Sequence, residues 1–220
     1  MYYPYVPYHR QPDSEQRVRS MTVTGNGSVS VQPDIARIQL AVVTEDESLT
    51  QAQQENAQAM NQVIEALMTL GLARENIQTT SYTIIPNYDF VDGLQVFRGY
   101  EVRNEITVEV QSIDQIGKII DVAVQNGVNH VSNIQFTVQD KQHYYQEALV
   151  SALQNATMKS QTIAQTMQLN LDPTPIRIVE EVIDNQINFK AFATSLDNIS
   201  TPIEPGEIII MAKVEVKYQY

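Results

Sequence analysis

The feature that most constrains the fold of this chain is an order of patterns that occurs twice in its middle part. Each copy begins with apolar and polar residues in alternation, which is typical of a half-buried strand. A stripe of apolar residues at helical spacing follows, and then a second strand-like segment. The expected elements are, in order, a strand at 37–43, a helix at 49–70, a strand at 77–85, a strand at 102–110, a helix at 113–127 and a strand at 134–138. This order predicts a ferredoxin-like core, in which an antiparallel sheet carries both helices on one face.

Both expected helices begin with the pattern of a capping box, in which a serine side chain and a glutamine side chain bond backbone N–H groups reciprocally. The pairs are Ser48 with Gln51 and Ser112 with Gln115. Gly71 stands where the first helix should end, which is typical of a C-terminal cap.

The C-terminal part of the chain predicts elements outside this core. A long helix is expected from Lys141 to about Leu169, followed by a strand at 177–183, an irregular connection at 184–205 and a final strand that opens at Gly206. The predicted fold class is therefore α+β: a ferredoxin-like split βαβ-βαβ core with an additional long helix and C-terminal strands.

Residues 1–20 differ in composition from the rest of the chain. Tyrosines interleave with prolines there, namely Tyr2, Tyr3, Tyr5 and Tyr8 with Pro4 and Pro7. Proline at this density disfavours helix and sheet, so we expect a disordered Tyr/Pro-rich tail at 1–20 and one domain at 21–220. The tail is either a plain disordered end or a segment that binds a partner.

The composition excludes several classes of protein. A formal net charge of -12 opposes nucleic-acid binding and docking on anionic lipid, because both need clustered Lys and Arg. The absence of cysteine excludes disulfides, thiolate metal sites and cysteine nucleophiles. No apolar run approaches the roughly 20 residues of a membrane helix, so we expect no membrane insertion. Residues 1–20 lack the apolar centre of a signal peptide, so we expect a cytoplasmic location.

Motifs along the chain resemble those of the SIMPL-domain family, also called DUF541. The opening resembles its V-x-G-x-G-x-V and P-D-x-A pattern, the middle its G-Y-x-x-x-N strand, and the end its P-G segment followed by V-x-V-x-Y. The residues that carry the resemblance are Val23, Gly25, Gly27, Val29, Pro33, Asp34, Ala36, Gly99, Tyr100, Asn104, Gly117, Gly127, Asn129, Phe136, Pro205, Gly206, Val214, Val216 and Tyr218. Their order and spacing cover nearly all of residues 21–220.

The resemblance implies an α+β domain that tends to self-associate. It also implies a link to stress tolerance and, in animal relatives, to signalling-kinase partners, but no established catalytic residue. The chain departs from the family in two places. Many bacterial members resemble exported envelope proteins with signal peptides, whereas this chain begins with the Tyr/Pro segment, and Ser160 stands where the family tends to place alanine.

The segment Gly25-Asn26-Gly27 has some likeness to a phosphate-binding loop. It lacks the third glycine and the strand-to-helix context that the dinucleotide fingerprint needs. Because it lies between strand-like residues, a bulge or a tight turn is the better interpretation.

No other pattern predicts chemistry. The histidines His9, His130 and His143 are not at metal-ligand spacing, and no hydrolase elbow or zinc-protease helix occurs. The acidic run 45–47 could attract a cation, but it also precedes a helix, where the dipole stabilises negative charge, and we favour that interpretation. Asn56 falls on an apolar helical stripe, so we expect it to bond nearby backbone. We predict no catalytic, cofactor-binding or metal-binding residues and no cofactor.

The most suggestive segment is the one around Asp92-Gly93, which is a strong signal for a tight hairpin turn. This hairpin is inserted between the two β-α-β halves and need not be covered by either helix. Exposed aromatic residues on it would form a protein contact surface. The candidate contact residues are Tyr88, Phe90, Leu94, Val96 and Phe97. The alternative, that the hairpin folds back on its own core, stays open.

Three functional hypotheses follow from these observations. The first is a non-enzymatic homo-oligomer that assembles through strand edges and the aromatic hairpin and acts as a scaffold or binding protein linked to stress tolerance. The second is a monomeric adaptor whose Tyr/Pro tail recruits a protein partner or a surface layer. The third is an enzyme with an unrecognised site, which would need a polar pocket with titrating groups.

Overall fold

The computed structural model describes residues 19–181, the strand at 188–190 and residues 201–220. Most of the predicted tail, residues 1–18, and most of the connection at 184–205 lie outside the described residues, so the tail remains a prediction. The chain forms two compact units. The first unit consists of residues up to Ser28, Glu147–Asp184 and Met211–Tyr220, and the second unit consists of Val29–Gln146 and Asn185–Ile210.

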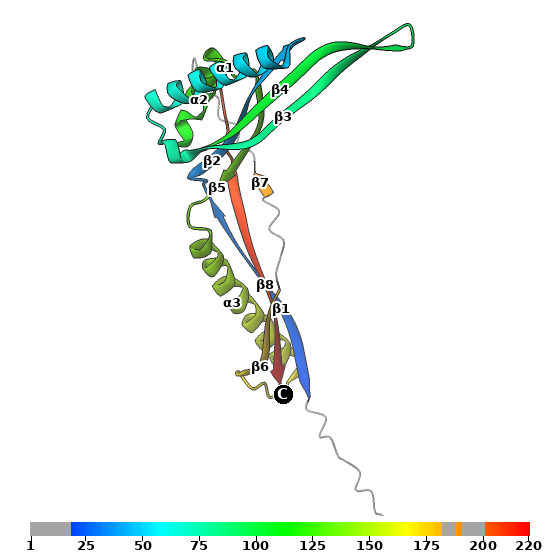
Figure 1. Cartoon of the computed structure of the whole chain (residues 1–220). Coiled ribbons are helices and arrows are strands. Elements are labelled where there is room, and N and C mark those ends of the chain that lie inside the picture. Colours follow the sequence, from blue (N-terminus) through cyan, green and yellow to red (C-terminus); the bar gives the residue numbers. More distant parts are fainter. Residues whose placement is uncertain (1–18, 182–187, 191–200) are drawn as a thin grey trace, which may run out of the picture. The chain divides into compact units, whose positions relative to one another are not determined.

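The second unit contains the predicted ferredoxin-like core (Figure 1). Its elements are β2 (Ile35–Asp46), α1 (Leu49–Thr69), β3 (Ile77–Val91), β4 (Leu94–Val110), α2 (Ile116–Gln125) and β5 (His130–Thr137). The strands form one sheet in the order β3-β4-β2-β5, and every neighbouring pair is antiparallel. This is the arrangement that a β-α-β, β-α-β chain adopts in a split βαβ fold, so the prediction is confirmed.

Large aliphatic side chains fill the space between the sheet and its helices. Ile38 and Leu40 of β2 and Ile106 of β4 lie on the face of the sheet that α1 covers. Helix α1 contributes Val63 and Leu67 to the same core. All five are completely buried. The alternation along β2 and β4 therefore places one residue in two in the core, as the sequence predicted.

The ends of the two helices fit the prediction only in part. Gly71 and Gly127 follow α1 and α2 with φ of 104° and 124°, a conformation that glycine adopts at little cost. The predicted capping boxes are wrong, because neither Ser48 nor Ser112 makes a side-chain cap hydrogen bond. The Ser48 N–H instead donates to Asp46 Oδ1 at 2.7 Å, so the aspartate before the helix takes the role that the capping box assigned to the Gln51 side chain.

The first unit holds a long helix and the C-terminal strands. Its elements are α3 (Lys141–Met167), β6 (Pro175–Glu181) and parts of β1 (Ser20–Val31) and β8 (Glu207–Gln219). The sheet order is β1-β8-β6, and the short β7 (Asn188–Lys190) pairs with the β8 residues of the second unit. The structure thus contains the predicted α+β class with its additional helix and strands.

Helix α3 contacts β1 through residues without bulky side chains. Five small residues lie buried at intervals of four along the helix: Ala148, Ala152, Ala156, Ser160 and Ala164. A Cβ atom added to Gly25 would lie 2.0 Å from the carbonyl oxygen of Ala152, and one added to Gly27 would lie 2.0 Å from that of Ala148. We call this contact the glycine seam.

The glycine seam corrects the interpretation of Gly25-Asn26-Gly27 as a bulge or turn. β1 runs without interruption from Ser20 to Val31, and neither glycine has a positive φ. The glycines are needed for space, since the helix backbone comes too close to the strand for any side chain. Between them, the backbone N–H of Asn26 donates a hydrogen bond to Asn155 Oδ1 of α3 at 3.2 Å.

Candidate protein contact surface

The hairpin of β3 and β4 extends past the helices and the rest of its sheet (Figure 1). We call residues 86–100 the arm. Pairing of β2 with β4 ends at Asp46 opposite Tyr100, whereas pairing of β3 with β4 continues to Val91 opposite Leu94. Among the described residues, the arm beyond Tyr100 is therefore a two-stranded ribbon whose outer edges have no strand partner.

The turn at the tip of the arm has the predicted form. Asp92 and Gly93 both have positive φ, 52° and 80°. Positive φ at both central residues is the signature of a type I′ turn, whose twist matches that of the flanking strands. The predicted hairpin is confirmed.

One face of the arm is aromatic. Tyr88 lies opposite Phe97, and Phe90 lies two residues further along the same face. The ring of Phe97 makes edge contacts with Tyr88 and Tyr100, at centroid distances of 5.6 Å and 5.2 Å. These contacts order the aromatic side chains without burying them.

The other face of the arm is aliphatic. Val96 lies opposite Asp89, and Val91 lies opposite Leu94. Arg98, the extra residue of a bulge in the ladder, forms an ion pair with Asp89. This ion pair neutralises the charge of Asp89. The apolar side chains of Val91, Leu94 and Val96 therefore dominate this face.

All five candidate contact residues are exposed, and Phe90 and Leu94 are the most exposed, at 77% and 71%. The alternative in which the arm folds back on its own core is therefore not the arrangement of this structure. The predicted role of these residues in protein contact remains a prediction, because the structure is of a single chain.

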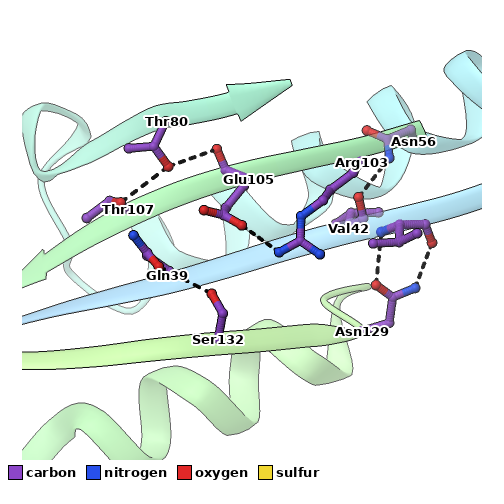
Figure 2. Close-up of polar contacts among 10 residues, drawn as sticks. Gln39, Val42, Asn56, Thr80, Arg103, Glu105, Thr107, Asn129 and Ser132 are labelled. Carbon is purple, nitrogen blue, oxygen red and sulfur yellow. Dashed lines mark hydrogen bonds and ion pairs between the residues drawn. The ribbon is translucent and has the colours of Figure 1, made fainter. Parts of the chain in front are cut away.

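The sheet face opposite α1 and α2 has a different character, which Figure 2 shows. Arg103 pairs with Glu105 at 2.6 Å along β4. Thr107 Oγ1 donates to Thr80 Oγ1 at 3.3 Å, and Thr80 Oγ1 donates to the Glu105 carbonyl oxygen. Polar groups on this face are engaged with one another, so it offers a partner far less apolar surface than the arm does.

Two asparagines hold the backbone of β2 near the base of the arm (Figure 2). Asn56 is completely buried, and its Nδ2 donates to the carbonyl oxygens of Val42 and Val102, each at 2.9 Å. The expected bond from Asn56 to nearby backbone is thus confirmed. Asn129 accepts from the Val43 N–H at 2.9 Å and donates to the Val43 carbonyl at 2.7 Å, so its amide replaces one peptide of a strand. From the sequence, Asn129 was named only for the family resemblance, and these bonds were not predicted.

The structure does not gather the remaining polar candidates into a site. Glu45 accepts a hydrogen bond from Asn87, and Asp46 from the Ser48 N–H, so the acidic run serves local structure. His130 begins β5 and His143 lies in the first turn of α3, while His9 is outside the described residues. Within the described ranges, no group of three or more His, Cys, Asp or Glu residues is placed to hold a metal ion. No helix in the described part of the chain is both long and apolar enough to cross a membrane.

Comparison with known proteins identifies relatives along almost the whole chain. Residues 21–218 match the family model described as "SIMPL: Protein of unknown function (DUF541)". The chain is 26% identical over 215 residues to the 26 kDa periplasmic immunogenic protein of Brucella melitensis, covering 90% of this chain and 84% of that protein. The same figures hold for the protein of that name in Brucella abortus. The present chain is also 24% identical over 153 residues to the uncharacterized protein YggE of Escherichia coli K12, covering 70% of this chain and 62% of YggE.

These relatives overturn the expected cytoplasmic location. The two Brucella proteins are named as periplasmic, on the far side of the inner membrane from the cytoplasm. The expectation rested on the composition of residues 1–20 alone, and nothing in the remaining chain supported it. A chain without cysteine suits a reducing and an oxidising compartment equally well.

Proposed function

The chain belongs to the SIMPL family, and on that premise we propose that it is a non-enzymatic binding scaffold that assembles into homo-oligomers through the arm. We further propose a periplasmic location, on the strength of the names of the Brucella relatives. A link to stress tolerance is part of the proposal, because the family resemblance implies it.

The observation that carries this proposal is the exposed apolar surface of the arm. Side chains such as Phe90 and Leu94 gain roughly 1.5–3 kcal/mol when they are fully buried. Several such residues on one projecting ribbon are typical of an interaction surface rather than of a free protein surface. Both faces of the arm are apolar, so a partner can cover either one.

Charge and backbone pairing favour a second copy of the chain as that partner. The arm contains Asp89, Asp92 and Arg98, which give it a net charge of only -1, whereas the whole chain carries -12. Contact between the arms of two copies therefore involves less electrostatic repulsion than contact between most other parts of their surfaces. A free strand edge also pairs readily with an identical edge, and antiparallel pairing of two equal strands is closed by two-fold symmetry.

The test is the mass of the protein in solution, measured by light scattering coupled to gel filtration. We expect a discrete multiple of the 24.8 kDa chain. Replacing Tyr88, Phe90 and Phe97 together with serine should lower that mass and leave the far-ultraviolet circular dichroism unchanged.

A matched control removes exposed apolar side chains from another surface. Val150, Met158 and Met167 of α3 are also more than half exposed, so the triple serine variant at these positions should keep the parent mass. A monomeric parent protein, or an arm variant that keeps the parent mass, would contradict the proposal.

The adaptor hypothesis stays as a second candidate, supported by the tyrosine and proline content of residues 1–20. A pull-down that compares the full chain with a version that starts at Met21 separates it from assembly through the arm. Equal recovery of partners by the two proteins would exclude the tail as the binding segment.

A further inference from the structure

We propose that a cavity at the C-terminal end of α3 binds a neutral, polyhydroxylated small molecule of the size of a simple sugar. The cavity has a volume of about 430 Å³ and lies entirely within the first unit. That volume is within the range of roughly 300–1,000 Å³ that is usual for small-molecule sites. The inference is independent of the arm and goes beyond the proposed assembly.

The wall of the cavity is rich in carboxamides and free of charge. Gln161, Gln165, Gln168 and Asn170, all exposed, line its mouth, and none of the described residues that line it is Asp, Glu, Lys, Arg or His. An ionised ligand would lose its hydration there without meeting an opposite charge, which is costly. A wholly apolar ligand would instead cover the amides without bonding them. The lining therefore favours a neutral ligand with many hydrogen-bonding groups.

The hydroxyl groups of the floor require hydrogen-bond donors from the ligand. Thr157 Oγ1 donates its one proton to the Leu153 carbonyl oxygen at 3.0 Å. In the 3.2 Å contact between Thr157 Oγ1 and the Tyr218 hydroxyl, tyrosine must then be the donor. Both protons are committed within the protein, and the oxygens of Thr157 and Tyr218 keep only lone pairs for a ligand. Sugar hydroxyls can donate to these oxygens and also bond the amides at the mouth.

The backbone at the mouth is an independent indication of function. Gln168 directly follows α3 with φ of 53°, and the Leu169 N–H closes the helix end by bonding the Ala164 carbonyl at 2.8 Å. Glycine occupies the positive-φ position after α1 and α2, at Gly71 and Gly127. At α3 the chain instead keeps a strained glutamine, whose carboxamide lines the cavity. Strain that is retained at a cavity is typical of a binding site.

The experiment is a titration of the ¹⁵N-labelled full chain, followed by the NMR signals of its side-chain NH₂ groups. The probes are glucose and N-acetylglucosamine, which are neutral, glucosamine, which is cationic at neutral pH, and glucuronate, which is anionic. We expect saturable shifts of the cavity glutamines with at least one neutral sugar, and at least about tenfold weaker binding of both charged sugars. Equal or tighter binding of a charged sugar, or no saturable binding of either neutral one, would overturn the proposal.

Variants separate the cavity from general surface effects. Gln168→Gly removes one amide and relieves the positive φ, so it should fold and should weaken binding by about fivefold, the usual effect of one hydrogen bond. Tyr218→Phe keeps the ring and should weaken binding to a similar degree. Gln154→Ala, on α3 outside the cavity, is the matched control and should leave affinity unchanged. Parent affinity in folded Gln168→Gly and Tyr218→Phe proteins would show that the cavity is not the site.

Discussion

Helices cover sheets in both units, but the side chains between helix and sheet differ in size. In the second unit, α1 meets its sheet through large aliphatic residues such as Val63 and Leu67. In the first unit, α3 meets β1 through alanines and two glycines, close enough that an added Cβ would overlap backbone oxygen. Large side chains fill the layer in the second unit, whereas the two backbones lie in direct contact in the first. The stability of the second unit should therefore fall when side-chain atoms are removed, and that of the first unit when atoms are added.

The largest effect is expected from Leu67→Ala in the second unit. Leu67 is completely buried, and the cavity left by its truncation should lower the free energy of unfolding by roughly 2–5 kcal/mol. Urea denaturation of the variant and the parent measures the change. The volume-conserving control Leu67→Met should cost less than about 1.5 kcal/mol. Equal losses in the two variants would mean that volume does not hold this layer.

Gly27→Ala should come next, although it adds only one methyl group. The new Cβ would lie 2.0 Å from the Ala148 carbonyl oxygen, so α3 or β1 must move, and we expect a loss of about 3 kcal/mol. Hydrogen exchange should show the loss in α3 and β1. Gly93→Asn, at a glycine with open space around it and a φ that asparagine tolerates, should cost far less.

A second variant sharpens the seam prediction. An added Cβ at Gly25 would also meet the Ala156 Cβ at 2.8 Å, but its nearest neighbour is the Ala152 carbonyl oxygen, which no substitution removes. Ala156→Gly should therefore fail to rescue Gly25→Ala. If Ala156→Gly restored the full stability of Gly25→Ala, side chains and not the two backbones would set the distance between α3 and β1.

Asn56→Leu tests the one polar side chain among the buried residues of α1. Leucine is apolar and similar in size to asparagine, but it leaves the carbonyl oxygens of Val42 and Val102 without their donor. We expect a loss of about 2 kcal/mol, measured by thermal and urea unfolding. Asn56 Oδ1 is buried and has no partner among the described residues, which is a cost that leucine removes. A variant more stable than the parent would mean that this cost exceeds the stabilisation from the two hydrogen bonds.

The smallest effect on stability is expected in the arm. Phe90→Ser removes a ring that is 77% exposed, so the free energy of unfolding of the separated chain should change by less than about 0.5 kcal/mol. Urea unfolding in dilute solution, where assembly is weakest, measures this change. A loss comparable to that of Leu67→Ala would show that the ring is buried within its own chain.

The sequence was most informative where a structure depends on residues that are close together in the chain. Alternation and helical spacing predicted the order of β2, α1, β3, β4, α2 and β5, and Asp92-Gly93 predicted the turn of the arm, because each depends on nearby residues. The capping box at Ser48 failed because Asp46, two residues earlier, accepts the Ser48 N–H that the Gln51 side chain was expected to bond. Local patterns cannot rank such competitors.

Contacts between distant residues were beyond prediction from one sequence. Gly25 and Gly27 meet α3 residues more than 120 positions away, so a pattern confined to the strand suggested a bulge in place of a seam. The cavity was missed for the same reason, since Tyr218 and Thr157 meet only in the folded unit and carry no motif. The exposed arm residues could be named, because a hairpin outside both β-α-β halves has little core to enter, but what covers them depends on other molecules.

The glycine seam also limits how this chain can evolve. Every amino-acid substitution of glycine introduces a residue with a Cβ, so only synonymous changes at Gly25 and Gly27 spare the contact. A saturation library should recover almost no substitutions at these two positions, while the tip of the arm accepts many. Lineages could then alter the arm and its partners freely, while the seam stays fixed.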